Sequence, residues 1–363
     1  KSQKILQQAE EQKKLNLFMK YNVLERDVNQ VNETVILNRN CTHIDIVYTW
    51  VNGSDPRFVN KRKEAGFDVK RDIERYRDFG ALKYSLRSIK KFAPWAKNIW
   101  ILTDSQIPDF FDFDSTAESN IKFIFHESFF KNLTHLPTFS SVSIESNFYN
   151  LPEEVSNCFL YFNDDVILKS PVQQSDFFDA NYNQVIFEVN DPIGLKIYRK
   201  FNQLDPYYQS IVLSSQLLDS KWNDKQDRFK NDHGIQVFDR KVLLQMYKEI
   251  GEEMDIASSH NTRVSTDPQL AFIYNQFVKR YVPLFKAVRG FNFYGGITTN
   301  FAQVRVALQD AYKTNAKALC FNDGLNGQSR YYKDVLYELI NFYDSLVPEP
   351  APWEKVVKSR YVE

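Results

Sequence analysis

The chain has 363 residues, of which 43% are hydrophobic and 25% charged, a composition typical of a globular protein with a full core. Lys plus Arg and Asp plus Glu both number 46, so the formal net charge is zero. This balance argues against a protein that binds nucleic acid or a membrane surface through bulk charge.

The N-terminal segment is polar and rich in Gln, Glu and Lys, and we interpret residues 1–42 as a helical arm or stalk. No run of about 18 apolar residues occurs, so nothing in the sequence predicts a membrane span. Because the chain begins at Lys1 without Met, we expect a membrane anchor to precede it in the full-length protein.

Apolar runs and helical patterns alternate from His43 onward. Residues 44–51 predict a buried strand, and apolar residues at helical spacing predict a helix over 82–92. Further strands are predicted at 99–102, 121–125, 159–162 and 185–189. This order predicts an α/β fold with a mostly parallel, Rossmann-like (GT-A-like) sheet flanked by helices.

The second half of the chain is less regular. Residues 190–232 are polar and predict an irregular insertion over the sheet. Helices are predicted over 240–250, over 268–281 with Thr266 as N-cap, and over 331–346, and a short strand over 318–321. We therefore predict one domain over residues 43–347 and a tail over 348–363.

Three cysteines, Cys41, Cys158 and Cys320, allow at most one internal disulfide and match no metal-ligand spacing. Cys158 and Cys320 each precede an apolar run that ends in Asn-Asp, so both are interpreted as buried strand residues. Glycosylation tripeptides, which matter only in a secretory protein, begin at Asn32, Asn40, Asn52 and Asn132.

Ligands of open α/β sheets bind at the carboxyl ends of the strands, which makes the residues there the candidate site. The strand over 159–162 ends in Asn163-Asp164-Asp165, and paired carboxylates suit Mg²⁺ or Mn²⁺ held against a diphosphate. Asp323, after the C-terminal strand, can complete this site, and one carboxylate can instead act as a general base. A strand that simply ends in a polar turn is the plainer interpretation.

The exit of the first strand, residues 48–51, offers aromatic surface and backbone groups to a nucleotide, and Asp55 follows in the next turn. A core position for Tyr48 and Trp50, with Asp55 as a turn residue, is the plainer interpretation.

Arg75, Arg77 and Arg87 flank the first predicted helix, and Asp78 lies near its start. Guanidinium groups beside a helix N-terminus suit a diphosphate. A solvated basic face is the commoner fate of such residues.

Two further residues are candidates for the reaction itself. His233 lies just ahead of a predicted helix and is a candidate acid or base, although a lone His is more often structural. Arg263 can neutralise charge on a transferring phosphoryl group. The sequence contains no Gly-rich phosphate loop, serine nucleophile elbow or zinc-ligand spacing, which disfavours hydride transfer, P-loop hydrolysis and zinc catalysis.

Taken together, these blocks resemble the Stealth family of sugar-1-phosphate transferases, and most of all the α/β subunit of the lysosomal-enzyme GlcNAc-1-phosphotransferase. The four regions that carry the resemblance lie, in order, at residues 44–55, at 77–95 with 132–165, at 233–240 with 263–272, and at 320–323. Four blocks in the right order are far more specific than any single motif.

The resemblance implies a phosphotransferase of the Golgi lumen that uses UDP-GlcNAc and a divalent metal, Mg²⁺ or Mn²⁺. The implied acceptor is a mannose hydroxyl on the high-mannose glycans of lysosomal glycoproteins, and UMP is released. We further expect a homodimer. The alternatives are a metal-dependent glycosyltransferase that releases UDP, and an inactive relative that binds a glycan or nucleotide sugar.

The resemblance also implies roles for individual residues. The nucleotide sugar would contact Tyr48, Thr49, Trp50, Val51, Asp55, Arg77, Asp78, Arg87 and Asn322. The catalytic group would comprise Asp165, His233, Arg263 and Asp323, with Asp164, Asp165 and Asp323 as metal ligands. Candidates on the acceptor side are His135, Ser141 and Glu145. One departure stands out, because Phe79-Gly80 replace the Asn-Glu pair usual in the family.

Overall fold

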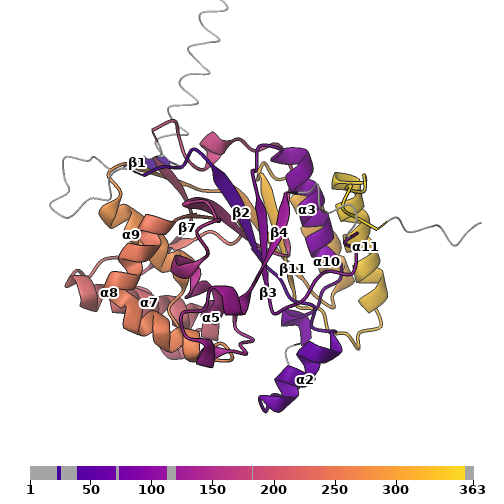
Figure 1. Cartoon of the computed structure of the whole chain (residues 1–363), viewed down its shortest axis with the longest axis horizontal. Coiled ribbons are helices and arrows are strands. Elements are labelled where there is room, and N and C mark those ends of the chain that lie inside the picture. Colours follow the sequence, from indigo (N-terminus) through magenta and orange to yellow (C-terminus); the bar gives the residue numbers. More distant parts are fainter. Residues whose placement is uncertain (1–22, 26–38, 71–72, 113–119, 182, 356–363) are drawn as a thin grey trace, which may run out of the picture.

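The computed structural model describes residues 23–25, 39–70, 73–112, 120–181 and 183–355. Within them, three β-sheets run through the middle of the molecule and helices cover both sides (Figure 1). The α/β fold predicted from the sequence is confirmed, and the central sheet is mostly parallel.

The central sheet has five strands in the order β4-β3-β2-β5-β9. Their bounds are Ile121–Phe125, Ile99–Thr103, Ile44–Thr49, Cys158–Asn163 and Gln236–Asp239. The first four are parallel and almost wholly apolar, because a parallel sheet is covered on both faces. Strand β9 pairs antiparallel with β5 and closes one edge.

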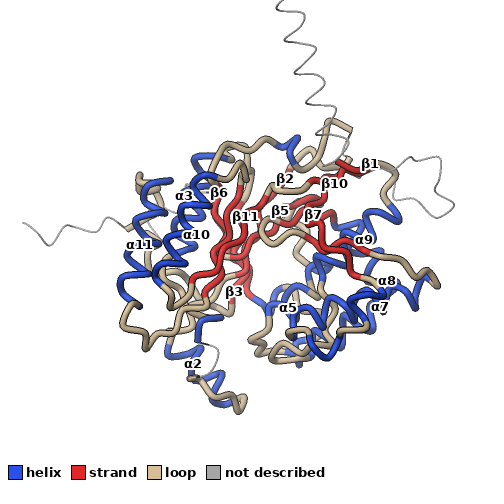
Figure 2. The backbone as a smooth tube through the Cα atoms, turned by 180° about the vertical axis from the view of Figure 1, so that it is seen from behind, coloured by secondary structure: helices blue, strands red, loops and turns tan. Residues whose placement is uncertain are grey.

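Two smaller sheets complete the strands (Figure 2). One has the order β11-β12-β6, with bounds Asn292–Ile297, Ala318–Asp323 and Val166–Leu168. The other has the order β1-β10-β7-β8, with bounds Val23–Glu25, Phe285–Val288, Gln184–Ile193 and Arg228–Asn231. Asp164 and Asp165 are the two residues between β5 and β6, so they connect the central sheet directly to the β11-β12-β6 sheet along the chain.

Helices α5 (Ser141–Glu145), α7 (Pro206–Trp222), α8 (Arg240–Ser259) and α9 (Leu270–Tyr281) lie on one side of the strands. Helices α3 (Ala81–Phe92), α10 (Phe301–Lys313) and α11 (Tyr332–Leu346) lie on the other, and α2 (Pro56–Glu64) projects from one end (Figure 1). The short helix α6 spans Leu195–Tyr198. No helix within the described ranges is both long and apolar enough to cross a bilayer.

Helix α3 joins the two sheets that Asp164 and Asp165 connect along the chain. Ser85 accepts a hydrogen bond from the Tyr48 hydroxyl of β2 at 2.7 Å and donates to the Val166 carbonyl of β6. Ser88 accepts a hydrogen bond from the Leu168 amide at 2.9 Å. The helix therefore fixes β2 and β6 relative to each other through buried hydroxyl groups.

Several sequence predictions need correction. The strand predicted at 185–189 belongs to a separate sheet, as β7, and the segment 190–232 contains the 17-residue helix α7 and strand β8. Helix α8 continues to Ser259 past a kink at Ile250, and α9 is preceded by Gln269 rather than by Thr266 as N-cap. The buried side of α7 includes Ser210, Ser214 and Ser215, so the apolar periodicity of this helix is weak in the sequence.

Of the predicted N-terminal arm, only Val23–Glu25 and the residues from Arg39 onward lie within the described residues. Val23–Glu25 form strand β1, which pairs antiparallel with β10, and not a helix. The remainder of the arm, with Asn32, lies outside the described residues.

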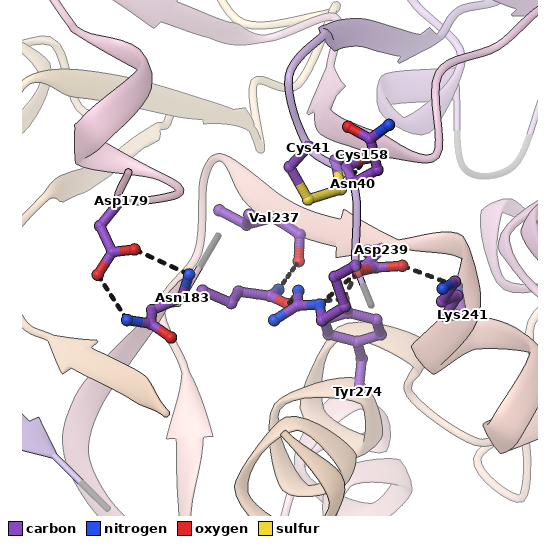
Figure 3. A network of polar contacts seen from close by, with 11 residues as sticks. Asn40, Cys41, Cys158, Asp179, Asn183, Val237, Asp239, Lys241 and Tyr274 are labelled. Carbon is purple, nitrogen blue, oxygen red and sulfur yellow. Dashed lines mark hydrogen bonds and ion pairs between the residues drawn. A yellow bond between two sulfur atoms is a disulfide. The ribbon is translucent and has the colours of Figure 1, made fainter. Parts of the chain in front are cut away.

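A disulfide between Cys41 and Cys158 anchors the segment that leads into β2 to the start of β5 (Figure 3). Beside it, Arg39 donates to the Asp239 carboxylate at 2.5 Å and to the Gln184 amide oxygen at 2.6 Å. Three cysteines allow at most one internal disulfide, and the bridge joins Cys41 to Cys158. Cys320 is free, and it is buried on a strand, as the sequence analysis predicted.

Replacing both Cys41 and Cys158 by Ser should lower the free energy of unfolding by about 2–5 kcal/mol, because the bridge closes a loop of more than one hundred residues in the unfolded chain. Urea unfolding followed by circular dichroism measures this change. Reductant should bring the wild-type midpoint down to that of the variant and leave the variant unchanged. Equal midpoints for both proteins without reductant would contradict the prediction.

Candidate active site

The turn between β5 and β6 places Asp164 and Asp165 at the carboxyl end of the central sheet. Both residues are half-buried. One oxygen of Asp165, Oδ1, is fully buried and has no hydrogen-bond partner among the described residues. A buried carboxylate oxygen without a donor is costly unless a cation or a ligand satisfies it.

The two carboxylates repel each other and a third one nearby. Burial, followed by the charges of Asp165 and Asp78, raises the pKa of Asp164 well above its usual range. Burial also raises the pKa of Asp165 to about 6, although a hydrogen bond from the Cys320 thiol opposes the rise. The turn therefore concentrates negative charge that a bound cation would relieve.

Asp323, at the end of β12, is held by Arg77 from the segment before α3. The guanidinium donates to both carboxylate oxygens, at 2.6 and 3.0 Å, and to the Leu325 carbonyl at 2.6 Å. This fork-to-fork pair is about nine-tenths buried on each side. Arg77 therefore positions Asp323, and the charge of Asp323 contributes to the raised pKa of Asp165.

Asp78 is oriented by two donors at the start of α3. The Trp50 indole N–H donates to one oxygen at 2.8 Å, and the Gly80 amide donates to the other at 2.6 Å. Gly80 has a φ of +90°, a left-handed conformation that glycine adopts without strain. Gly80 belongs to the Phe79-Gly80 pair that departs from the usual family pattern. Its left-handed conformation shapes the backbone of this turn, and its amide donates to Asp78.

Replacing Trp50 by Phe should lower the free energy of unfolding by about 1.5 kcal/mol, because the indole hydrogen bond goes to a charged group. Affinity for a nucleotide-sugar donor should also fall, because Asp78 loses its orientation. Trp95→Phe is the matched control, since the Trp95 indole donates to the neutral Val172 carbonyl elsewhere. Calorimetric titration of UDP-GlcNAc should show weaker binding for Trp50→Phe alone, and unchanged binding would contradict the assignment.

A second polar group lies at Glu145, the last residue of α5. The Tyr161 hydroxyl donates to Glu145 Oε1 at 3.1 Å and is itself 2.9 Å from the Thr49 hydroxyl. Burial raises the pKa of Glu145 to about 7, while the charge of Arg263 and hydrogen bonds from Tyr161 and Ser141 lower it. Glu145 is thus a carboxyl group that exchanges its proton near neutral pH.

Arg263 extends from the loop before α9 toward these groups and is exposed. Its guanidinium donates to the Ser141 hydroxyl at 2.8 Å. Its charge also lowers the pKa values of Glu145, Asp165 and His233. The Arg263 side chain is therefore accessible to solvent, and its charge acts on Glu145, Asp165 and His233.

His233 lies in the loop between β8 and β9, where the Asp232 carboxylate accepts a hydrogen bond from its amide at 2.9 Å. Burial, with the charges of Lys230 and Arg263, lowers the pKa of His233 to about 4. The imidazole is therefore neutral at physiological pH. Its ring lies edge-on to Tyr294, with 4.8 Å between the ring centroids.

Electrostatic coupling links the four residues predicted as catalytic. Asp323 and Arg263 both influence the pKa of Asp165, and Arg263 influences that of His233. The four come from β12, the loop before α9, the β5–β6 turn and the β8–β9 loop. Their chemical roles remain predictions.

Some predicted nucleotide contacts lie elsewhere. Tyr48 is fully buried in the core, where it packs on Phe162. Arg87 is six residues into α3, about 9 Å along its axis, and binds both oxygens of Glu354 at 2.6 Å. The predicted nucleotide contacts of Tyr48 and Arg87 are therefore corrected. Tyr48 is a core residue, and Arg87 forms an ion pair with Glu354 near the C-terminus.

Asp55 caps α2 by accepting from the Arg57 amide at 2.8 Å, and it also pairs with the Arg57 guanidinium. Val51 is half-buried beside this turn, and Asn322 is exposed on β12. Both ring nitrogens of His135 are engaged in hydrogen bonds, with Ser258 at 2.9 Å and with Asn132 at 3.0 Å.

His135 also lines an open hollow of about 830 Å³ over the C-terminal half of α8. None of the four residues predicted as catalytic lines that hollow. The assignment of His135 to the acceptor side stays a prediction.

Sequence reasoning missed Tyr161, Asp232, Tyr207 and Tyr294. Alternation along β5 places Tyr161 on the same face as Asn163, which directly precedes the β5–β6 turn. This spacing could have identified Tyr161 from the sequence. Tyr294 lies on β11, a strand that the adjacent Gly295 and Gly296 concealed. Tyr207 lies in the segment that was interpreted as irregular.

The donor set at the β5–β6 turn fits a hard divalent cation, because it consists of carboxylate oxygens, one of them buried without a partner. Asp164 and Asp165 can supply those oxygens. Asp78 and Asp323 are further candidate ligands, although the oxygens of each already accept hydrogen bonds, from Trp50 and Gly80 and from Arg77 respectively. Within the described ranges, the tight cluster of metal-ligand atoms is Cys41, Cys158 and Asp239. Its two sulfurs form the disulfide, so it is not a metal site.

The chain matches the four conserved regions of the Stealth proteins in their usual order. Stealth conserved regions 1, 2, 3 and 4 match residues 42–69, 75–186, 232–280 and 311–361. Together the matches span well over half of the chain. They include the β5–β6 turn, Glu145, His233, Arg263 and Asp323.

Curated relatives share moderate identity. The exopolysaccharide phosphotransferase CpsY of Mycobacterium tuberculosis is 28% identical over 325 residues, which cover 86% of this chain and 58% of that protein. The capsular polysaccharide phosphotransferase fcs1 of Haemophilus influenzae is 27% identical and is covered to 83%, as is this chain. The chain thus spans little more than half of the mycobacterial relative.

Similarity to solved structures is weak. The galactosyltransferase LgtC, in complex with donor and acceptor sugar analogues, is 13% identical with a TM-score of 0.35, over 85% of this chain and 99% of LgtC. The bifunctional glycosyltransferase WbbM is 13% identical with a TM-score of 0.41, over 85% of this chain and 54% of WbbM. Scores below 0.5 establish nothing further about this chain.

Proposed function

Because the chain belongs to the Stealth protein family, we propose that it transfers a sugar 1-phosphate from a nucleotide sugar to a hydroxyl group of an acceptor sugar. The observation that carries the proposal is the convergence of Asp165, Glu145, His233 and Arg263 at the carboxyl end of the central sheet. The names of curated relatives, which are polysaccharide phosphotransferases, support the same reaction class.

In the proposed step the acceptor oxygen attacks the β-phosphorus of the donor. The bond between that phosphorus and the bridging oxygen breaks, and the nucleoside monophosphate leaves. A divalent cation, when bound, would offset charge on the diphosphate, and Asp164, Asp165 and Asp78 are the residues that would hold it. Arg263 reaches the same region and can stabilise charge on the transferring phosphoryl group.

The proton of the attacking hydroxyl needs an acceptor whose pKa lies near the working pH. Glu145, with a pKa raised to about 7, meets this condition better than His233, whose pKa is lowered to about 4. We assign the proton to Glu145. His233, which is neutral, offers one donor and one acceptor nitrogen to orient the substrate.

The finer assignment follows the resemblance to the lysosomal-enzyme GlcNAc-1-phosphotransferase. It comprises UDP-GlcNAc as donor, a mannose hydroxyl of high-mannose glycoproteins as acceptor, UMP as product, the Golgi lumen as location, and a homodimer as assembly. The disulfide supports an oxidising compartment. The names of the bacterial relatives favour a second candidate, in which the acceptor hydroxyl belongs to a polysaccharide.

Nucleotide release tests the proposed reaction. The purified chain is incubated with UDP-GlcNAc and Mn²⁺ or Mg²⁺, with methyl α-D-mannopyranoside as acceptor probe, and the nucleotides are separated by chromatography. UMP together with a GlcNAc-phosphate diester supports the proposal. UDP as product would identify a glycosyltransferase, and calorimetric binding of UDP-GlcNAc without either product would identify an inactive relative.

A further inference from the structure

Two tyrosine rings lie exposed beside the reacting groups, and the proposed phosphoryl transfer gives neither of them a task. Tyr294 is 51% exposed and Tyr207 is 38% exposed. An exposed aromatic ring beside polar groups offers an apolar surface on which a ligand can stack. The apolar face of a pyranose ring is a ligand that such rings accept, with nearby polar groups fixing its orientation.

Tyr294 is positioned by β11 and by the loop that carries His233. Asn292, two residues earlier on the same face, accepts a hydrogen bond from the Ile235 amide at 3.0 Å, which ties β11 to that loop. The rings of Tyr294 and His233 meet at 86° with their centroids 4.8 Å apart. Tyr294 is also in register with Cys320, whose thiol hydrogen-bonds to Asp165.

The strand surface beyond Tyr294 has no side chain at Gly296. Gly296 follows on the same face, and a Cβ atom built there would meet only Thr298, at 4.0 Å. Gly296 is in register with the exposed Asn322 of β12. The ring therefore borders a flat, open strip with one amide group beside it, which is the geometry needed to receive a sugar ring and one of its hydroxyls.

Tyr207 approaches the same strip from another element. It lies in the first turn of α7, where the Asp205 carboxylate accepts a hydrogen bond from its amide at 2.9 Å. Burial, with the charges of Tyr208, Glu145 and Tyr294, raises the pKa of its phenol. The charges of Glu145 and Tyr294 thus act on Tyr207, which couples this ring to the proposed proton acceptor.

We propose that Tyr294 and Tyr207 form the binding site for the pyranose ring of the acceptor sugar, with Tyr294 as the stacking surface. This inference rests on the proposed function. The Tyr294 ring adjoins His233 and the charge of Glu145 acts on Tyr207, whereas Trp50 and Asp78 mark the separate edge where we expect the donor nucleotide. The acceptor hydroxyl would then face Glu145 while its ring lies on Tyr294.

Kinetics of Tyr294→Ala test the proposal, with UDP-GlcNAc as donor and methyl α-D-mannopyranoside as acceptor probe. The KM for the mannoside should rise about ten-fold, the scale expected for loss of one aromatic stacking contact, while the KM for UDP-GlcNAc changes by less than about two-fold. Tyr294→Phe should keep the wild-type KM for the mannoside, because the ring is retained. Tyr207→Ala should raise the same KM.

Tyr337→Ala is the matched control, because Tyr337 is a similarly exposed tyrosine on α11. It should leave both KM values unchanged. A rise in the KM for UDP-GlcNAc alone would assign the ring to the donor sugar and overturn the proposal, as would an unchanged KM for the mannoside in Tyr294→Ala.

Saturation-transfer NMR of the mannoside with the wild-type protein and Mg²⁺ gives a readout that does not depend on turnover. Signal from the mannoside ring protons should be present in the wild type and lost in Tyr294→Ala. Absence of this signal from the wild type overturns the acceptor site, even if UMP is released from UDP-GlcNAc by hydrolysis. Failure to release UMP under any condition, with the NMR signal present, contradicts the proposed function and leaves the sugar site standing.

Discussion

Replacing Glu145 by Gln should lower the rate of UMP release by about 10²–10⁴-fold, the range for loss of a general base. Gln keeps the size of the side chain and can still accept the hydrogen bond from Tyr161, so the loss should come from the missing proton acceptor. The free energy of unfolding should change little or rise, because a half-buried charge is removed. Steady-state kinetics with UDP-GlcNAc and methyl α-D-mannopyranoside measure the rate.

The pH profile separates this role from a structural one. The base must be ionised, and burial raises the pKa of Glu145 to about 7, so the wild-type rate should rise between about pH 6.5 and 8. The residual rate of Glu145→Gln should be flat over the same interval. Glu338→Gln, an exchange on the exposed face of α11, should retain the wild-type rate and profile. A residual rate that still rises with an apparent pKa near 7 would assign the proton to another group.

Replacing Asp165 by Asn should have two opposite effects, on turnover and on stability. Turnover should fall by about 10²–10³-fold, since the substitution removes a charge from the proposed cation site and reacting centre. Stability at pH 7.5 without divalent cations should instead rise by about 1–3 kcal/mol, because the wild type holds a carboxylate whose pKa is raised to about 6.

The direction of the stability effect follows from proton binding. Asp165 titrates at about 6 in the folded chain and at about 3.9 in the unfolded chain, so between these values the folded chain holds more protons. Wild-type stability therefore falls as pH rises from about 4 to 6 and stays lower above it.

Urea midpoints in EDTA at pH 4 and pH 7.5 check this, with a gain for Asp165→Asn at pH 7.5 only. Asp310→Asn, an exposed exchange on α10, serves as the control and should change neither stability nor turnover. A variant that loses stability at pH 7.5 would show that Asp165 has a structural partner and is not a strained carboxylate.

The parts of the fold that could be predicted are those with a dense local signal. The first strand, the helix that follows it and the strand ending at Asn163 were placed within one or two residues, because apolar periodicity and turn residues mark them. Helix α7 was missed because it is partly polar on both faces. Strand β10 has only four residues, and β11 contains two adjacent glycines before its last residue, Ile297.

The site shows the same division. Asp164 and Asp165 could be predicted because a buried strand ends directly in two carboxylates. Arg87 could not, since its partner Glu354 lies 267 residues further along the chain and no local pattern announces that contact. Glu145 was selected only as an acceptor-side candidate, because its raised pKa depends on tertiary burial and on its approach to Tyr161 and Arg263.

The link between β5 and β6 has a mechanical consequence. Two residues connect one sheet to another, and the serines of α3 hold those sheets together from outside the site. A small rotation between the sheets would change the spacing of Asp164 and Asp165 before it disturbed any other element. Substitutions at Ser85 or Ser88, which contact β2 and β6, should therefore alter the preference of the proposed site for one cation over another. The packing between the two sheets would then help to set the metal selectivity of the site.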